Sequence, residues 1–177
     1  MQIEQFFLKS VGEWNCMRSG HSLAFQEFEE IRSKIKITPA ITNDNRLTNL
    51  VKDNLITSNE VNKAFLINWE PKTEWGEENQ KDNYSGESII LPIEISKTEG
   101  KIIRSVGYTE AVQIVSLYKI LDDGTLIIYS DYSHTCTEER IWFVSNNVRS
   151  SSSVTRAIDS LAILQTSYAS EIRSIKK

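Results

Sequence analysis

The chain of 177 residues is poor in cysteine and histidine, with two of each. Cys16 and Cys136 are too few for a disulfide scaffold or a four-ligand zinc site. No apolar run reaches the roughly 18–20 residues of a membrane helix, and Pro92 and Glu94 interrupt the longest one. The first residues lack a basic segment followed by a long apolar one, so we expect no secretory signal.

Several motifs are also missing. The sequence contains no G-x-G-x-x-G, no P-loop and no G-x-S-x-G, which disfavours the nucleotide-binding and hydrolase classes that use them. His134 and Cys136 have no second pair at metal-ligand spacing, so we expect no metal site. The formal net charge of −4 and the pI of about 5.3 argue against a general nucleic-acid binder.

The remaining composition is that of an ordinary globular protein, with 40% hydrophobic and 25% charged residues. The length is most simply one domain, residues 1–177. A chain of this size buries about two thirds of its unfolded surface, which is enough for a core and a ligand cavity. We therefore expect a soluble single-domain protein of a reducing compartment.

Helical periodicity is confined to a few segments. Ile3, Phe6 and Phe7 predict a short N-terminal amphipathic helix. A second helix is expected over 43–55, with Asn43 or Asp44 at its start. A third, weaker candidate covers 154–162.

Most other segments have strand character. Alternation or β-rich composition predicts strands near 14–19, 31–37, 64–69, 87–95, 101–107, 112–120, 125–132, 140–145 and 161–172. Asp122-Asp123-Gly124 is a typical hairpin turn, and Asn146-Asn147 marks another. The expected fold class is all-β: an antiparallel barrel of about eight to ten strands that holds one small ligand, with a β-sandwich as the competing architecture. The serines at 150–153 are expected at a turn or strand start.

The segment 137–143 is a predicted strand that carries a carboxylate on the same face as two apolar residues. Glu139, Ile141 and Phe143 share one face, and the intervening residues, Trp142 among them, share the other. A carboxylate on an apolar interior face needs a donor. That donor is either a neighbouring arginine, with Arg149 or Arg18 as candidates, or a ligand rich in N–H groups.

Arginines and tryptophans provide further candidates. The rigid guanidinium forks of Arg18, Arg149 and Arg173 suit ligand carboxylates. The four tryptophans are each expected in the core, although together they could form flat walls for a conjugated ligand. They are Trp14, Trp69, Trp75 and Trp142.

Three separated segments resemble the S-type (CpcS/CpeS) phycobiliprotein chromophore lyases. They are FFLKSVGEWNCMRSGHSLAF at 6–25, TEERIWFVSNNVR at 137–149 and SEIR at 170–173. Trp69, Trp75 and the pair at 107–108 fit the same order. The resemblance implies a lipocalin-like antiparallel barrel of about ten strands, with an N-terminal helix and one further short helix.

The resemblance also implies an activity. Such a lyase binds a linear tetrapyrrole as substrate, with no prosthetic group, and attaches it through a thioether to a cysteine of an apo-phycobiliprotein of the phycobilisome. Phycoerythrobilin and a phycoerythrin subunit are the expected pair. The nucleophilic thiol belongs to the acceptor, so Cys16 and Cys136 need not be catalytic.

By family position, the resemblance assigns roles to single residues. Glu139 accepts the pyrrole N–H bonds, and Glu171 orients an arginine or assists proton transfer. Arg18 and Arg149 hold the propionates, and Trp69 or Trp75 stacks on the tetrapyrrole. Trp142 and Arg173 complete the expected bilin-binding set.

The sequence departs from the family pattern at two positions. Only His21 is present where a histidine pair is common. Ser151 replaces an arginine, so one propionate contact is either missing or supplied by Arg156 or Arg104.

Two other functions remain open: a bilin carrier of the same fold without productive transfer, and an assembly partner of the apo-subunit that has lost tight bilin binding. The exposed sheet surface expected of the family leaves room for a homodimer. The expected location is the cytoplasm of a cyanobacterium, or the plastid stroma of an alga.

Overall fold

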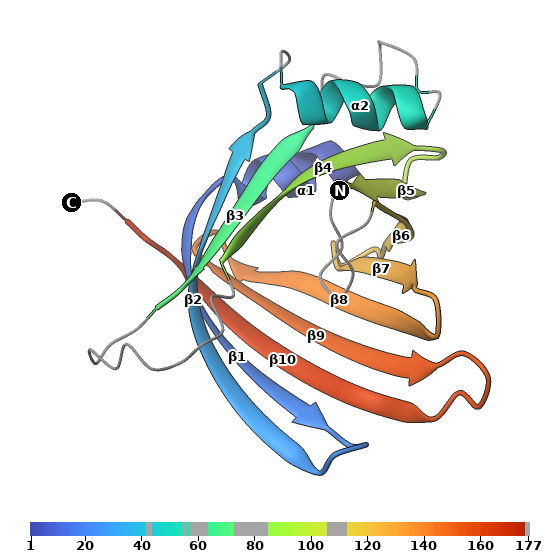
Figure 1. Ribbon diagram of the computed structural model, residues 1–177. Coiled ribbons are helices and arrows are strands. Elements are labelled where there is room, and N and C mark those ends of the chain that lie inside the picture. Colours follow the sequence, from blue (N-terminus) through green and yellow to red (C-terminus); the bar gives the residue numbers. More distant parts are fainter. Residues whose placement is uncertain (42–43, 55, 57–63, 73–84, 106–112, 176–177) are drawn as a thin grey trace.

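The computed structural model describes residues 1–41, 44–54, 56, 64–72, 85–105 and 113–175. Ten strands of this part of the chain pair antiparallel and close into a barrel, in the order β1-β10-β9-β8-β7-β6-β5-β4-β3-β2 (Figure 1). The strands are β1 (Gly12–Ser22), β2 (Glu27–Pro39), β3 (Phe65–Pro71), β4 (Gly86–Glu94), β5 (Glu99–Arg104), β6 (Ile114–Ile120), β7 (Leu126–Asp131), β8 (Thr135–Ser145), β9 (Val148–Ala157) and β10 (Ile163–Arg173). The barrel confirms the predicted fold class and excludes the sandwich.

The predicted hairpin turns are present. Gly124, between β6 and β7, has a φ of +84°, which a glycine adopts without strain. The backbone N–H of Leu121 donates to the Thr125 carbonyl at 2.9 Å and closes this turn. Strand β9 follows β8 directly after Asn146 and Asn147.

The weak helix prediction over 154–162 is wrong. Residues up to Ala157 belong to β9, which pairs with β8 on one side and β10 on the other. The serines at 150–153 lie inside this strand rather than at a turn. Pairing along both edges of β9 overrides the weak helical spacing, as tertiary context commonly does.

Helix α1 (Ile3–Ser10) places its apolar face in the interior of the barrel. Ile3, Phe6 and Phe7 are at most 5% exposed and belong to the interior core. The Phe7 ring stacks on Phe65 of β3, with centroids 5.2 Å apart. This helix therefore fills part of the space inside the strands.

Helix α2 (Asn45–Asp53) covers the outside of the barrel near β4, as Figure 1 shows. Leu47 and Leu50 pack in a second core with Ile89 and Leu91, which lie on the outer face of β4. The Asp44 side chain accepts a 2.9 Å hydrogen bond from the Arg46 backbone N–H and caps the helix. Contacts with Arg46 lower the pKa of the Asp44 carboxyl. Of the two predicted caps, Asp44 is the one the structure shows.

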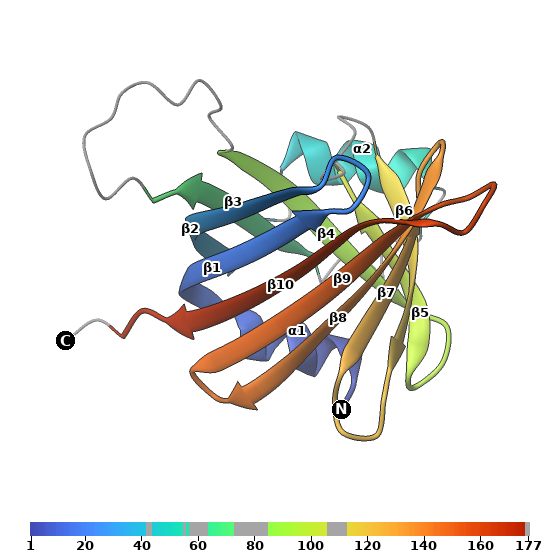
Figure 2. The same cartoon turned by 90° about the horizontal axis from the view of Figure 1, so that it is seen from below.

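The barrel wall is taller on one side. Strands β1, β2, β8, β9 and β10 have 10 to 13 residues, whereas β5 and β7 have six each. Figure 2 shows β1, β10, β9 and β8 side by side along this wall. The inner face of the long strands therefore extends beyond the short ones and carries the site described next. In the described residues, no helix is long and apolar enough to cross a membrane.

Candidate functional site

Cross-strand register places the predicted site residues in rows on the inner face of β8, β9, β10 and β1. The first row contains Phe143, Arg149, Glu171 and Cys16. The second contains Ile141, Ser151, Ala169 and Arg18, and the third contains Glu139, Ser153, Ser167 and Gly20. Charged residues therefore occur in all three rows, and small residues occupy the middle of the second and third.

Five charged side chains converge on the interior cavity. They are Arg18, Arg104, Glu139, Arg149 and Glu171. Their formal charge is +1, from three arginines and two glutamates. Apolar side chains of α1, β2, β3, β4 and β7 line the rest of the cavity. The site thus combines a cationic wall with an apolar one.

Two interior ion pairs organise these charges. Arg149 directs both Nε and Nη2 to Oε2 of Glu171, and both side chains are less than a tenth exposed. Arg104 of β5 places Nη2 3.6 Å from Oε2 of Glu139. The ion pair of Glu139 is thus with Arg104 and that of Arg149 is with Glu171, whereas the salt-bridge alternative proposed Arg149 or Arg18 for Glu139.

The enclosed part of this cavity is small, with a volume of about 70 Å³. Pockets for drug-sized ligands measure about 300–1,000 Å³. The enclosed space alone is therefore too small for a ligand of that size.

Arg104 is predicted from the sequence only as a substitute contact, although the structure places it in the interior ion pair with Glu139. The side chain is 4% exposed on the inner face of β5, where it follows Ile102 at the strand period of two. A charged residue at an inward position of an apolar strand is the sequence signal that could have identified it. Arg156, the other substitute, lies on the opposite face of β9 from Ser151 and Ser153.

Arg173 is engaged at the end of the barrel near α1. Its Nη2 donates to the Lys9 carbonyl at 2.6 Å, and its Nη1 donates to the carbonyl of Val11. Its guanidinium carbon lies 4.2 Å from the centre of the Trp14 ring. Burial, and then the charge of Arg149, lower the pKa of the Arg173 guanidinium. The structure therefore places Arg173 outside the cavity that holds the five charged side chains, in contact with the C-terminal end of α1 and with Val11.

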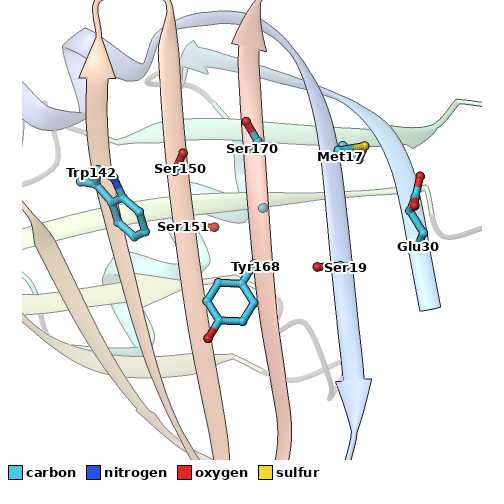
Figure 3. A pocket seen from close by; sticks show the side chains of 9 residues that line it. Met17, Ser19, Glu30, Trp142, Ser150, Ser151, Tyr168 and Ser170 are labelled. Carbon is cyan, nitrogen blue, oxygen red and sulfur yellow. The ribbon is translucent and has the colours of Figure 1, made fainter. Parts of the chain in front are cut away.

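Trp142 lies on the outer face of the barrel. Figure 3 shows it beside Ser150 of β9, with Tyr168 of β10 and Met17 of β1 across the same shallow depression. Glu139 faces the interior, so the two residues are on opposite sides of the sheet. The structure does not bring Trp142 to the five charged side chains of the interior cavity.

Trp69 of β3 pairs with Ile35 of β2 and therefore shares its face of the sheet. Ile35 lines the interior cavity, which places Trp69 on the inner face toward the end of β3. Trp75 and the pair at 107–108 lie outside the described residues.

The histidines and cysteines form no nucleophilic pair in the structure. The His21 ring packs edge-on against Phe28, with centroids 4.9 Å apart. Cys16 is buried, and its burial, followed by the charge of Glu171, raises the pKa of the thiol. Within the described ranges, no three His, Cys, Asp or Glu side chains are grouped to hold a metal ion.

Comparison with known proteins adds a family match over nearly the whole chain. Residues 2–174 match the model of the family described as CpeS-like protein. The chain is 36% identical over 176 residues to chromophore lyase CpcS/CpeS 3 of Trichodesmium erythraeum, covering 98% of this chain and 100% of that protein. A protein of Microchaete diplosiphon, named as a candidate phycoerythrobilin lyase CpeS, is 32% identical over 151 residues, covering 84% of this chain and 66% of its own length.

A solved structure shares the fold. The S-type phycobiliprotein lyase CPES of Guillardia theta superposes with a TM-score of 0.84 at 25% identity, covering 100% of this chain and 95% of that one. The agreement spans the barrel and both helices, so the inner face has a structural counterpart in a lyase.

Proposed function

The chain belongs to the CpcS/CpeS family of chromophore lyases, and from this we propose that it binds a linear tetrapyrrole along the inner face of its long strands and attaches it to a cysteine of an apo-phycobiliprotein. The observation that carries the proposal is the convergence of Glu139, Arg18 and Arg149 on one cavity within this fold. The family relationship supports the lyase reaction, and the cavity supports the residue roles.

The chemistry of a bilin matches that of the inner face. Its inner pyrrole N–H groups need an acceptor, which Glu139 supplies, and that contact also stabilises a cationic bilin. Its two propionates need guanidinium partners, and Arg18 and Arg149, which line the cavity, are the proposed ones. Its conjugated body needs a flat surface, and Ser151 and Ser153 leave room for one because their side chains are small.

The reaction forms one carbon–sulfur bond. The acceptor thiolate adds to the exocyclic ethylidene carbon of ring A, the double bond is consumed, and the adjacent ring carbon takes a proton. Glu139 or Glu171 assists that proton transfer, since both carboxyl groups line the cavity. Holding the bilin in one conformation provides much of the remaining rate enhancement through positioning.

Phycoerythrobilin and a phycoerythrin subunit are the proposed substrate pair. The name of the Microchaete diplosiphon relative supports this choice over a phycocyanin pair. Trp69 is proposed to stack on the tetrapyrrole from β3. Trp75 is proposed, from the sequence alone, as the alternative stacking residue.

A carrier that binds bilin without transferring it is the second candidate. Ser151 favours it, because the arginine expected there is absent. Arg104 argues for the lyase, because it brings a third guanidinium to the same cavity from β5.

The cyanobacterial relatives support a location in the cytoplasm of a cyanobacterium, with the plastid stroma as the algal counterpart. A homodimer stays a prediction.

Co-expression tests the function. The protein is produced with an apo-phycoerythrin β-subunit and the enzymes that make phycoerythrobilin, and the acceptor is examined on a denaturing gel by zinc-enhanced fluorescence. A fluorescent acceptor band that depends on this protein supports the lyase. Coloured lyase without a labelled acceptor supports the carrier, and an uncoloured protein contradicts both.

A further inference from the structure

Trp14 of β1 contacts two arginines at the base of the cavity. Its side chain is 1% exposed. The guanidinium carbon of Arg149 lies 4.9 Å from the centre of its ring, and that of Arg173 lies 4.2 Å away. A guanidinium over a tryptophan face is held by attraction to the ring quadrupole, which is strongest where water is excluded.

The C-terminal end of α1 and the residue after it fix the orientation of this ring. Trp14 donates its Nε1–H to the carbonyl oxygen of Ser10 at 2.8 Å. Arg173 is fastened to the same segment by its bonds to the Lys9 and Val11 carbonyls. Gly12 has a φ of +136°, and a Cβ there would lie 2.5 Å from Nη1 of Arg173, so a glycine makes room for the guanidinium.

Arg149 has donors left for a ligand. Its Nε and Nη2 are directed to Glu171, and no described residue accepts from its Nη1. Because Glu171 holds one edge and the Trp14 ring holds the plane, the direction of the Nη1–H bonds is set before any ligand arrives. A guanidinium held in this way loses less side-chain entropy when it binds a carboxylate.

We propose that Trp14 is a positioning residue for the substrate: it holds the guanidinium of Arg149 in the plane in which that group binds one propionate of the bilin. The inference rests on the proposed bilin binding and deepens it. Trp14 itself lies outside the lining of the cavity, so it acts through Arg149.

A comparison of two ligands tests the inference. The full chain is titrated with phycoerythrobilin and with its dimethyl ester, which keeps the pyrroles and the conjugated body but lacks the carboxylates. We expect Trp14→Leu to weaken binding of the free acid about tenfold, as expected for a desolvated cation–π contact, and to change binding of the ester less than about twofold. Tyr168→Leu is the control on the outer face of β10, where this side chain is 58% exposed, and neither affinity should change.

Equal losses for acid and ester would overturn the proposal, because they would mean a purely structural role for Trp14. Unchanged binding of both would also overturn it. If Trp14→Leu does not fold, Trp14→Phe keeps an aromatic ring but removes the Nε1 bond and reduces the ring face, and it should lower the acid-to-ester preference about threefold. A folded wild type that binds neither ligand contradicts the proposed function itself, and the role of Trp14 fails with it.

Discussion

Arg104 and Glu139 meet inside the barrel, with Nη2 of the arginine 3.6 Å from Oε2 of the glutamate, although β5 and β8 are separated by β6 and β7. The arginine side chain is 4% exposed and the glutamate side chain 18%. The carboxylate is therefore the more exposed member of the pair, and the neighbouring guanidinium, which lines the same cavity, stabilises its charge.

Glu139→Gln should abolish or blue-shift the absorption of bound bilin while the fold is retained. The amide keeps the shape of the side chain but loses the charge that pairs with pyrrole N–H groups and with Arg104. Absorption spectra of the bilin complex and circular dichroism provide the measurement. Glu138→Gln is the control, since Glu138 faces outward and pairs with Arg140. A wild-type spectrum from the Glu139 variant would remove this residue from the pyrrole site.

Arg104→Gln should weaken bilin binding about tenfold, because one charge-assisted contact to a propionate carboxylate of the bilin is lost. Ser151→Arg in the same chain should restore part of the affinity, since residue 151 faces the same cavity. Dissociation constants for the single and double variants measure the effect. Arg140→Gln, on the outer face, should leave the affinity unchanged. An Arg104 variant with wild-type affinity would show that this guanidinium does not serve the ligand.

Glu171→Gln should lower the free energy of unfolding by about 3–5 kcal/mol, because it leaves the buried guanidinium of Arg149 without its counter-charge. Replacing both partners, with Glu171→Leu and Arg149→Met, should recover most of this loss but not bilin binding. Denaturant unfolding and bilin titration separate the two effects. A double variant as unstable as Glu171→Gln would contradict the ion-pair account.

Cys16→Ala combined with Cys136→Ala should keep transfer activity, because the nucleophile belongs to the acceptor. The raised pKa of the Cys16 thiol keeps it protonated near neutral pH, which makes it a poor nucleophile. Labelling of the acceptor on a denaturing gel is the readout. Loss of labelling in a double variant that still binds bilin would assign a catalytic thiol to this protein.

Tyr118→Phe should stabilise the fold by about 1 kcal/mol, because the buried Tyr118 hydroxyl has no hydrogen-bond partner among the described residues. Burial raises the pKa of Tyr118 to about 12, from 10.0. The unfolded chain therefore ionises first, and wild-type stability falls between about pH 10 and 12. The phenylalanine variant should lose less stability over this range. Unfolding curves at pH 8 and 11 measure both effects, and equal alkaline losses would contradict the assignment.

Local patterns predicted much of the fold. Alternation along β8 correctly placed Glu139, Ile141 and Phe143 on one face and Trp142 on the other. The resemblance nevertheless assigned Trp142 to the bilin, and the strand geometry separates it from the interior group. The helix expected over 154–162 failed because spacing within one segment contains no information about the strands that pair with it.

Most strand segments, the two short helices, the turns and the membership of a bilin-lyase family can be predicted from the sequence alone, because these depend on residues near one another in the chain or on separate motifs. Which charges meet depends instead on how the whole chain folds. Barrel closure brings Arg104 opposite Glu139, and the placement of α1 orients Trp14 beside Arg149 and Arg173. These contacts join distant segments, whose relative position is set by register around the whole barrel and by core packing.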